Sequence, residues 1–468
     1  MQYGTIIIKG SFQTISNSIK EFVAQLDSSS CVFVFCRTEY NAVGDVKHDF
    51  LDVIQLGVES GLTYINTIVT PSSDFIKADL PDNVLYIVWF VKSHESMVFR
   101  KDDIREPHIW KDVEWGHRTK NYNPKGKDPG NVWIPTEDDG KGNITKHILM
   151  DDALLIKRID DCTKQPTLPS LLISDIKEDS VLCPVDMLFE FRNDKGSMAR
   201  NVKSTRRGQI SVQQNSTGLH GDVIWGTSEN MSAIQNGCVD VVITSPPYWD
   251  LKDYFKKGQI GQESYQTYLD RLMKVWEECY NKLNDNGSIW LNINIRVKNN
   301  KVILIPRDFV KQCKKIGLHY KGILIWHKSS GIPTHEKNIV DRHEYILVFS
   351  KNEHLSITDA ISSYSDYSNP AINGGLFWNI NRKAGSVGKH YIHPAIYPNE
   401  LVTRIVECTT VEGQTVLDPF LGSGTTLIAS ILEHRNCYGY EYNEGFKDLI
   451  LSRIQTDIGK LVNFTLKI

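Results

Sequence analysis

The segment that most restricts the fold of this chain is VVITSPPYWD, residues 241 to 250. Its three consecutive β-branched apolar residues are typical of a strand buried inside a parallel sheet. Pro246 and Pro247 then end the strand, because each proline fixes φ and lacks a backbone donor. The carbonyl groups of this turn are consequently not used by a helix and can accept hydrogen bonds from a ligand.

The side chains beside the two prolines suit a planar group that carries an amine. Ser245 supplies a hydroxyl before the prolines, and Tyr248 and Trp249 supply aromatic rings after them. The hydroxyl and the carbonyl oxygens can accept from the amine, while a ring can stack on the planar face. The alternative interpretation is a strand-ending turn that is plugged by aromatic side chains.

A second informative stretch, TVLDPFLGSGTTLIAS, lies near the C-terminal end of the chain. A short strand is expected to end at Asp418, and Gly422 and Gly424 then allow a tight turn and a close backbone approach to a ligand. The free amides at the helix start that follows, at Thr425, favour a carboxylate or another acceptor. The next strand ends in Glu441, about 20 residues further on, where an acid binds ribose hydroxyls in nucleotide-binding α/β sheets.

The motifs TSPPYW and DPFLGSGTT together resemble those of the amino-group DNA methyltransferases. These S-adenosylmethionine-dependent enzymes methylate the exocyclic nitrogen of cytosine or adenine. The motif order, with the proline turn first and the glycine turn last, is similar to the class called beta, and serine before Pro-Pro-Tyr is similar to the form commonest in the cytosine-N4 branch. The resemblance covers residues 219 to 455 and implies an α/β fold, a Rossmann-like, doubly wound and mostly parallel sheet.

The resemblance also implies two groups of site residues. The catalytic group consists of Ser245, Pro246, Pro247 and Tyr248. The cofactor-binding group consists of Asp222, Thr244, Asp418, Phe420, Gly422, Ser423, Gly424, Thr425 and Glu441. We expect Asp418 to receive the ammonium of S-adenosylmethionine, Glu441 to bind its ribose and Asp222 to lie beside its adenosine. The sequence contains neither a phosphate-binding lysine after the glycine turn nor a metal-binding motif, so ATP, NAD and metals are poor candidates.

The proline turn suggests how an amine could be activated. The hydroxyl of Ser245 and the carbonyl of Pro246 can accept its two N–H groups and leave the nitrogen lone pair directed at the methyl donor. Tyr248 would stack on a base that is flipped out of the duplex. No cysteine follows a proline at this turn, which argues against methylation of the ring carbon.

The remainder of the second half predicts strands that alternate with helices. Asp222 is expected to end a short strand, with a helix through Met231 and Ile234 after it, although a turn or helix-cap role for this aspartate is the alternative. Residues 353 to 392 break the periodicity and contain interleaved aromatic residues, so they are the candidate target-recognition segment.

Residues 1 to 200 lack both motifs but repeat the pattern of the second half. GLTYINTIV and VLYIVWFVKS resemble GLHYKGILIW and EYILVFSKN, in the same order, and NVWIP and LLIKRIDDCTK resemble LFWNI and LVTRIVECTT. VLCPV matches VLDPF, with Cys183 in place of Asp418. These similarities predict a degenerate duplicate domain that serves as a scaffold, pseudo-subunit or DNA clamp, joined by a linker (201–218) to a catalytic domain (219–468). The alternative is that any two α/β segments look alike.

The composition of the chain is consistent with a protein of the cytoplasm of a prokaryotic or phage-host cell. The 468 residues carry a net charge of −3 and nine cysteines, without a membrane-spanning run or an N-terminal leader. Basic residues gather in groups that could contact phosphates. Duplex DNA and a restriction endonuclease of the same site are the expected partners, and the chain is expected to be a monomer with pseudo-dimeric halves or a homodimer.

The prediction is a site-specific cytosine-N4 DNA methyltransferase of a restriction-modification system. Adenine-N6 methylation, an RNA substrate and a non-catalytic DNA-binding or regulatory subunit are the alternatives. Nucleoside analysis of methylated DNA distinguishes adenine-N6 from cytosine-N4 methylation. Competition between DNA and RNA substrates tests the RNA alternative, and binding of S-adenosylmethionine tests the non-catalytic subunit.

Overall fold

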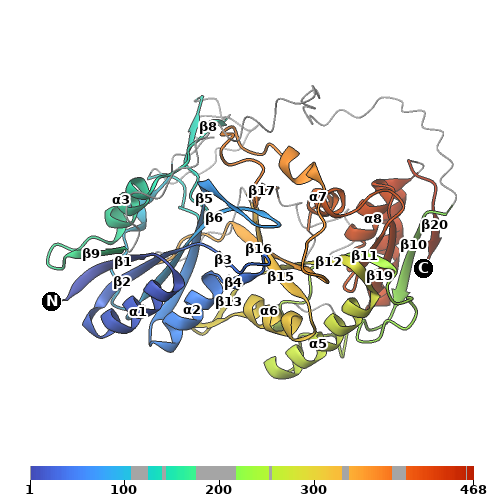
Figure 1. Ribbon diagram of the computed structural model, residues 1–468, viewed down its shortest axis with the longest axis horizontal. Helices are drawn as coiled ribbons and strands as arrows, with labels where there is room; N and C mark the ends of the chain where they lie inside the picture. Colours follow the sequence, from blue (N-terminus) through green and yellow to red (C-terminus); the bar gives the residue numbers. More distant parts are fainter. Residues whose placement is uncertain are drawn as a thin grey trace, which may run out of the picture.

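The computed structural model describes residues 2–106, 125–139, 144–174, 218–251, 256–328, 337–381, 397–459 and 461–468. Most of the predicted linker, the VLCPV segment and residues 382–392 of the candidate recognition segment lie outside the described residues. Two sheets dominate the described parts, one in each half of the chain (Figure 1). Among the described helices, none is long and apolar enough to cross a membrane.

The C-terminal half is built on a nine-stranded sheet. Its strands are β10 (His220–Trp225), β11 (Val239–Thr244), β12 (Leu283–Ile293), β15 (His319–His327), β16 (His343–Ser350), β17 (Phe377–Asn379), β18 (Thr415–Asp418), β19 (Asn436–Glu441) and β20 (Thr465–Lys467). They lie in the order β17-β15-β16-β12-β11-β18-β19-β10-β20. Only β16 runs against its neighbours, so the predicted mostly parallel sheet is confirmed.

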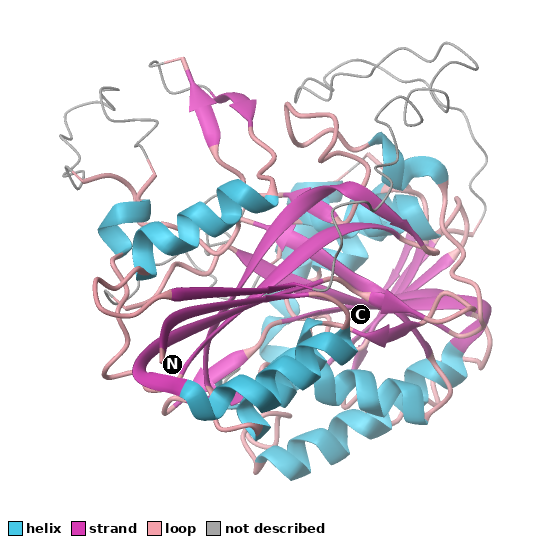
Figure 2. Ribbon diagram, turned by 60° about the vertical axis from the view of Figure 1, so that its left-hand side comes forward, coloured by secondary structure: helices cyan, strands magenta, loops and turns pink. Residues whose placement is uncertain are grey.

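Helices cover both faces of the sheets (Figure 2). In the C-terminal half they are α5 (Tyr265–Lys282), α6 (Ile305–Lys315), α7 (Asn399–Thr409), α8 (Thr425–Leu432) and α9 (Lys447–Arg453). Helix α5 illustrates the sequence logic: the hydroxyl of Ser264 caps it by accepting from the amide of Thr267, and Tyr268, Leu272 and Trp276 are buried at helical spacing. Helices on both faces explain why the middle of β11, Val241 to Ile243, and of β18, Val416 and Leu417, is apolar without alternation.

The N-terminal half contains a five-stranded sheet. Its strands are β1 (Tyr3–Lys9), β2 (Leu26–Cys36), β5 (Thr63–Lys77), β6 (Pro81–Val91) and β9 (Ser170–Ser174), in the order β5-β6-β2-β1-β9. Its helices are α1 (Phe12–Phe22), α2 (Phe50–Glu59) and α3 (Asp152–Thr163). Strand β6 is antiparallel to both neighbours, as β16 is in the larger sheet.

The five-stranded sheet and part of the nine-stranded sheet have the same connectivity. The path β1-α1-β2-α2-β5-β6-α3-β9 corresponds to β11-α5-β12-α6-β15-β16-α7-β18, with the same neighbours and directions. The amide of Val69 donates to the carbonyl of Asn131, and the amide of Ile325 donates to the carbonyl of Leu376 in the corresponding place. The first helices even begin alike, with SFQT and SYQT.

Two differences separate these matching paths. Strand β9, SLLIS, occupies the place of β18, so the strand that corresponds to VLDPF is not VLCPV. The turn after β1 is also short: only Gly10 separates β1 from Ser11, the N-cap of α1, whereas residues 245 to 263 separate β11 from the cap of α5. The described passage from β1 to α1 therefore has no counterpart of the proline turn.

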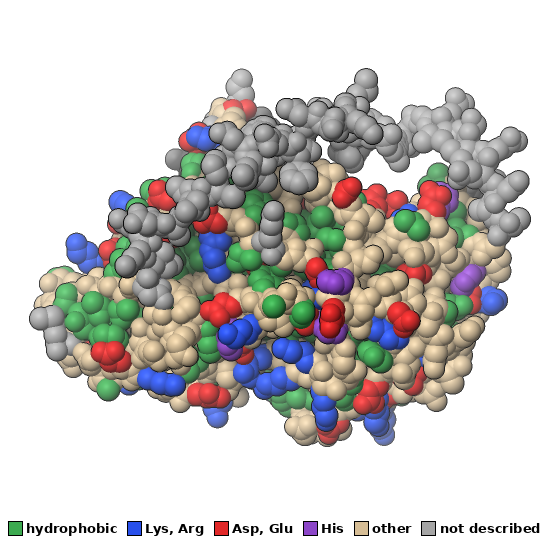
Figure 3. Space-filling view, viewed as in Figure 1, with side chains coloured by type: hydrophobic (Ala, Val, Ile, Leu, Met, Phe, Trp, Pro, Cys, Tyr) green, Lys and Arg blue, Asp and Glu red, His purple; other side chains and the backbone are tan. Residues whose placement is uncertain are grey.

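The halves contact each other reciprocally. The short strand β4 (Val46–His48) lies against β15, β14 (Lys301–Ile303) lies against β5, and α2 lies against α6. The side chain of Lys321 is fully buried between Asp45 and Asp79 of the first half, at 2.8 and 3.0 Å. Basic and acidic side chains gather over α2 and α6 on the face seen in Figure 3. Arg307 of α6 pairs with Asp52 of α2 at 3.1 Å.

One helix predicted in the C-terminal half is not formed. The helix expected through Met231 and Ile234 is wrong: residues 226 to 238 form turns, in which the side chains of Thr227 and Asn230 accept from nearby amides. Both apolar residues are nevertheless buried.

The described part of the candidate recognition segment, residues 353 to 381, is packed into the molecule. Tyr367, Phe377 and Trp378 are at most 4% exposed. Strand β17 joins the sheet beside β15, and the side chain of Asn83 from the first half bonds the backbone of Ile372 and Leu376. These aromatic residues therefore belong to the core and not to an exposed reading surface.

Candidate functional site

The proline turn and the glycine turn lie at the same edge of the nine-stranded sheet. Strands β11 and β18 pair in parallel, so the residues after both strands emerge side by side. From this point the chain continues to β12 on one side and to β19 on the other, and the crevice at such a switch point is where ligands bind in open α/β sheets.

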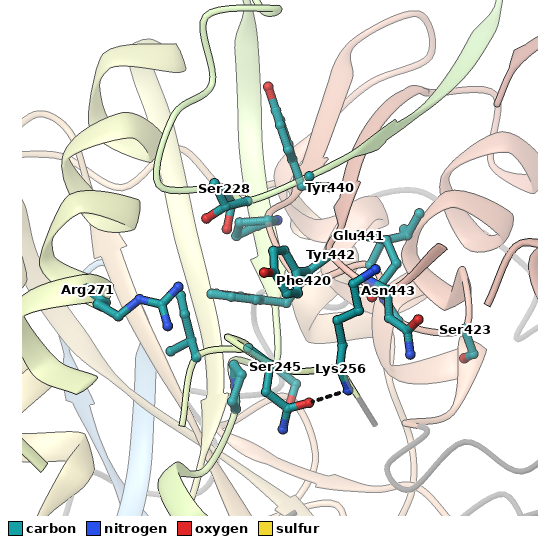
Figure 4. Close-up of a pocket in the computed structure, with 18 of the residues that line it drawn as sticks. Ser228, Ser245, Lys256, Arg271, Phe420, Ser423, Tyr440, Glu441, Tyr442 and Asn443 are labelled. Carbon is teal, nitrogen blue, oxygen red and sulfur yellow. Dashed lines mark hydrogen bonds between the residues drawn. The ribbon is translucent and has the colours of Figure 1, made fainter. Parts of the chain in front are cut away.

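A cavity opens at this point (Figure 4). Seven predicted site residues line it: Ser245, Pro247, Phe420, Gly422, Ser423, Thr425 and Glu441. Lining residues outside the two predicted groups of site residues include Ser228, Lys256, Gln259, Arg271, Tyr397, Tyr442 and Asn443. The two turns, which lie more than 170 residues apart in the sequence, thus share one cavity.

The glycine turn has the backbone that its sequence predicts. Gly422 and Gly424 have φ of 55° and 81°, in the left-handed region that favours glycine. Arg453, buried beneath the turn, donates to the carbonyl and the hydroxyl of Ser423 at 2.9 and 2.8 Å. The turn is therefore held from below, and its cavity side remains open to a ligand.

Glu441 ends β19 on the wall of the cavity. Its carboxylate accepts from the amide of Gly422 at 2.8 Å and from the amide of Asn443 at 2.7 Å. Burial raises the pKa of Glu441 to about 7, although these backbone hydrogen bonds act in the opposite direction. The structure thus places this acid beside the glycine turn, as the sequence predicts.

Asp418 occupies a different position from the one expected of an ammonium ligand. It is fully buried below the cavity, and burial raises its pKa. Four donors reach its carboxylate: the hydroxyls of Thr244, Thr426 and Tyr397 and the amide of Phe420, at 2.6 to 3.0 Å. Asp418 and Thr244 therefore join the ends of β18 and β11, and neither lines the cavity.

Tyr397 is a site residue that the sequence analysis missed. Its ring lines the cavity, and its hydroxyl lies 3.0 Å from Asp418 and 2.5 Å from Thr426. It directly precedes Pro398, the N-cap of α7. Its place directly before a proline at the start of a helix is the signal that the sequence offers.

The structure does not bring Asp222 to the cavity. This residue lies inside β10, not at its end, and its carboxylate is near His220 and Lys467. Because β10 continues to Trp225, the cavity wall is formed by the next three residues, Gly226 to Ser228. Gly424 caps α8 and does not line the cavity; a Cβ added to it would lie 3.4 Å from Ile450.

The proline turn is fixed by several contacts. The carbonyl of Pro247 accepts from the hydroxyl of Tyr268 at 2.6 Å. Trp249 has a φ of 47°, which is unusual for a bulky residue, and its indole donates to the carbonyl of Glu263 at 2.9 Å. The cationic groups of Arg296 and Lys298 lie 5.6 and 4.9 Å from its ring centre.

Comparison with known proteins gives one family for this region. Residues 239–452 match a family model described as DNA methylase, of the N6 and N4 type. The chain is similar to the type II methyltransferase M.Cfr9I of Citrobacter freundii, 28% identical over 56% of this chain and 95% of the relative. It is also similar to M.SmaI of Serratia marcescens, 29% identical over 50% of this chain and 89% of the relative.

Solved structures align with about half of the chain. PvuII DNA methyltransferase, described as cytosine-N4-specific, is 18% identical over 54% of this chain and 96% of its own, with a TM-score of 0.41. A putative DNA modification methylase of Thermus thermophilus, complexed with S-adenosyl-L-methionine, is 24% identical over 53% of this chain and 99% of its own, with a TM-score of 0.39. The fold is assigned from the strand order and directions given above.

Proposed function

We propose that this protein transfers a methyl group from S-adenosylmethionine to the N4 amine of cytosine in duplex DNA. The premise is that residues 239–452 belong to the DNA methylase family that comprises N6 and N4 amino-methyltransferases. The observation that carries the proposal is the single cavity shared by the proline turn and the glycine turn. One turn offers acceptors for an amine, and the other offers amides and an acid for a nucleoside-like methyl donor.

The residues around the cavity fit S-adenosylmethionine. Glu441 presents a carboxylate that suits the two ribose hydroxyls, and the glycine turn presents a backbone without side chains where the amino-acid end can approach. Phe420 and Tyr442 supply apolar area for the adenine ring. When bound, this cofactor supplies an electrophilic methyl group. Asp418 supports the site by holding β11 and β18 together.

The protein groups at the proline turn would activate the amine. The lone pair of an exocyclic amine is conjugated into the base ring, so the amine is a poor nucleophile. The hydroxyl of Ser245 and the carbonyl of Pro246 accept its two N–H groups and favour a tetrahedral nitrogen whose lone pair faces the methyl donor. The target base must leave the duplex to reach this turn, and the ring of Tyr248 provides a stacking surface.

Cytosine is proposed over adenine because Ser245 precedes Pro-Pro-Tyr, the form commonest in the cytosine-N4 branch. Adenine-N6 is the alternative product, and the same acceptors would serve its amine. We further propose that the protein acts in a restriction-modification system, since its relatives are described as type II methyltransferases.

For the N-terminal half we propose a degenerate duplicate of the catalytic framework. The domains would be residues 1–200 and 219–468, with 201–218 as the linker. The matching path of strands and helices supports this division, as does the absence of a proline-turn counterpart after β1. The reciprocal contacts between the halves support the role of a pseudo-subunit.

Single-molecule sequencing tests this function directly. DNA from a host without its own methylation, expressing the wild-type chain, should carry N4-methylcytosine within one sequence context. DNA from cells expressing Ser245→Ala should carry little or none, while the purified variant still binds S-adenosylmethionine. N6-methyladenine in the wild-type DNA would replace the proposed product by the alternative, and unmodified DNA would contradict the enzyme.

A further inference from the structure

A buried charged network lies behind the proline turn, outside the cavity described above. Glu344, on β16, accepts from the hydroxyl of Tyr248 at 2.9 Å and from the side-chain amide of Asn292 at 2.9 Å. The ammonium of Lys328 lies 2.8 Å from the same carboxylate. The side chains of Lys328 and Glu344 are only 3% and 16% exposed, so the ion pair is largely removed from water.

The charge of Glu344 is maintained in spite of its burial. Burial alone raises the pKa of a carboxyl group, but the charge of Lys328 and the hydrogen bonds from Lys328, Asn292 and Tyr248 outweigh it, so the pKa of Glu344 lies below its ordinary value. An ionised carboxylate is a strong acceptor for a phenol. Tyr248 is consequently held at its hydroxyl by Glu344 and at its backbone by the two preceding prolines.

The network continues into the N-terminal half. The amide of Lys328 donates to the carbonyl of Arg342 at 2.6 Å, and the amide of Arg342 donates to the side-chain oxygen of Asn131 at 2.8 Å. The side-chain amide of Asn131 also donates to Asp341 at 3.0 Å. A chain of contacts therefore runs from Asn131 through Arg342, Lys328 and Glu344 to Tyr248.

The matching strands of the N-terminal half show that the framework does not need this network. In the strand register, Glu344 of β16 lies opposite Trp326 of β15. In the corresponding place of the first half, Leu85 of β6 lies opposite Thr70 of β5. Asn292 pairs with Ile346, and the corresponding residue paired with Ile87 is Phe35. Both places are apolar in the half that lacks the proline turn. Since buried ion pairs are a costly way to stabilise a core, the polar residues are better explained by the turn that they contact.

We propose that Glu344 and Lys328 are positioning residues that hold the ring of Tyr248 ready to stack on the extruded base, and that Asn131 anchors them from the N-terminal half. This inference rests on the proposed function. It gives the N-terminal half an indirect, positioning role in catalysis, because its asparagine fixes the segment from which the positioning pair projects.

A double-mutant cycle on the purified full-length chain tests the inference. Tyr248→Phe removes only the hydroxyl, and Glu344→Ala removes its acceptor. Each should lower kcat about ten- to hundredfold on DNA carrying the mapped site, while the Kd for S-adenosylmethionine stays unchanged. The double variant should be no slower than the slower single variant, because both changes release the same ring. Asn131→Ala should lower kcat in the same direction by a smaller factor. Asp161→Ala, which removes the acid of an exposed helical ion pair with Lys157, is the matched control and should keep the wild-type kcat.

Three results would overturn the inference: a wild-type kcat in Tyr248→Phe, losses that multiply in the double variant, or a loss confined to cofactor affinity. If Glu344→Ala does not fold, Tyr248→Phe and Asn131→Ala carry the test, and a wild-type kcat in Tyr248→Phe still overturns the inference. A wild-type protein that transfers no methyl group to any DNA would contradict the proposed function instead.

Discussion

The backbone amide of Gly422 donates a hydrogen bond of 2.8 Å to the carboxylate of Glu441. This contact joins the glycine turn to the end of β19, so the group expected to meet the ribose is fixed by the loop expected to meet the amino-acid end of the same cofactor. A change in the charge of Glu441 should therefore affect both parts of the proposed cofactor site.

The affinity for S-adenosylmethionine should depend on pH near neutrality. The pKa of Glu441 is raised to about 7, so the carboxylate is mostly ionised at pH 8 and mostly protonated at pH 6. Loss of the ionised acceptor should weaken binding about tenfold between these values. Isothermal titration calorimetry measures this dependence, and Glu441→Gln should bind weakly and without the pH dependence. A wild-type affinity that is constant from pH 6 to 8 would exclude this role.

Without bound cofactor, the contribution of Glu441 to the free energy of unfolding should decrease as the pH rises, whereas its contribution to cofactor binding increases. The pKa of Glu441 is higher in the folded state than in the unfolded state, so its favourable contribution is fully present below about pH 4.5 and is lost as the pH rises to about 7. Urea unfolding of the wild type and of Glu441→Gln isolates this contribution, since the difference between them should change with pH over this range.

Gly439→Ala should disturb the cofactor turn from behind. A Cβ at Gly439, on β19, would lie 2.6 Å from a methyl carbon of Leu421, which directly precedes Gly422. Leu421 must then shift and take the turn with it, so cofactor affinity should fall more than tenfold while the chain stays folded. The double variant Gly439→Ala with Leu421→Ala removes the clash and should recover part of the affinity. Equal affinities of wild type and Gly439→Ala would show that the turn tolerates the shift.

Thr244→Val should destabilise the junction of β11 and β18. The hydroxyl of Thr244 donates to the buried carboxylate of Asp418 at 2.6 Å, and valine keeps the shape without the donor. The free energy of unfolding should fall by about 1 to 3 kcal/mol, measured by urea denaturation. Thr456→Val, which removes an exposed hydroxyl bonded within its own helix, is the control and should change it by less than about 0.5 kcal/mol.

Lys321→Ala should show that the halves form one stable unit. Lys321 is fully buried and faces Asp45 and Asp79 of the other half, so its removal leaves two carboxylates without their cation. We expect a loss of about 3 to 5 kcal/mol in urea unfolding. Lys311→Ala removes an exposed pair with Asp308 and should cost at most about 1 kcal/mol. A similar cost in both variants would mean that the interface is not stabilised by Lys321.

The sequence was sufficient to predict where the turns lie, because each is set by local features. The prolines end β11 regardless of how the surrounding chain packs. Gly422 and Gly424 have the positive φ that their spacing indicates. The parallel sheet followed from uninterrupted apolar strands that alternate with amphipathic helices.

What the sequence could not provide depends on contacts between distant segments. Asp418 was expected to face the cofactor, but Tyr397 and Thr426 reach it from two other elements and turn its carboxylate into the core. Asp222 was displaced from the site because β10 runs three residues further than expected. The pairing of Glu344 with Lys328 required β15 and β16 to be aligned, and no local motif announced it.

Because the chain passes directly from Gly10 into the cap of α1, the two halves of the molecule differ: the proline turn follows β11 but has no counterpart after β1. Under the proposed function, the chain offers a duplex two similar frameworks but extrudes a base toward only one of them. A palindromic sequence would consequently receive its methyl groups one strand at a time, with release and reversal of the protein between the two events, and half-modified DNA should accumulate before the fully modified product.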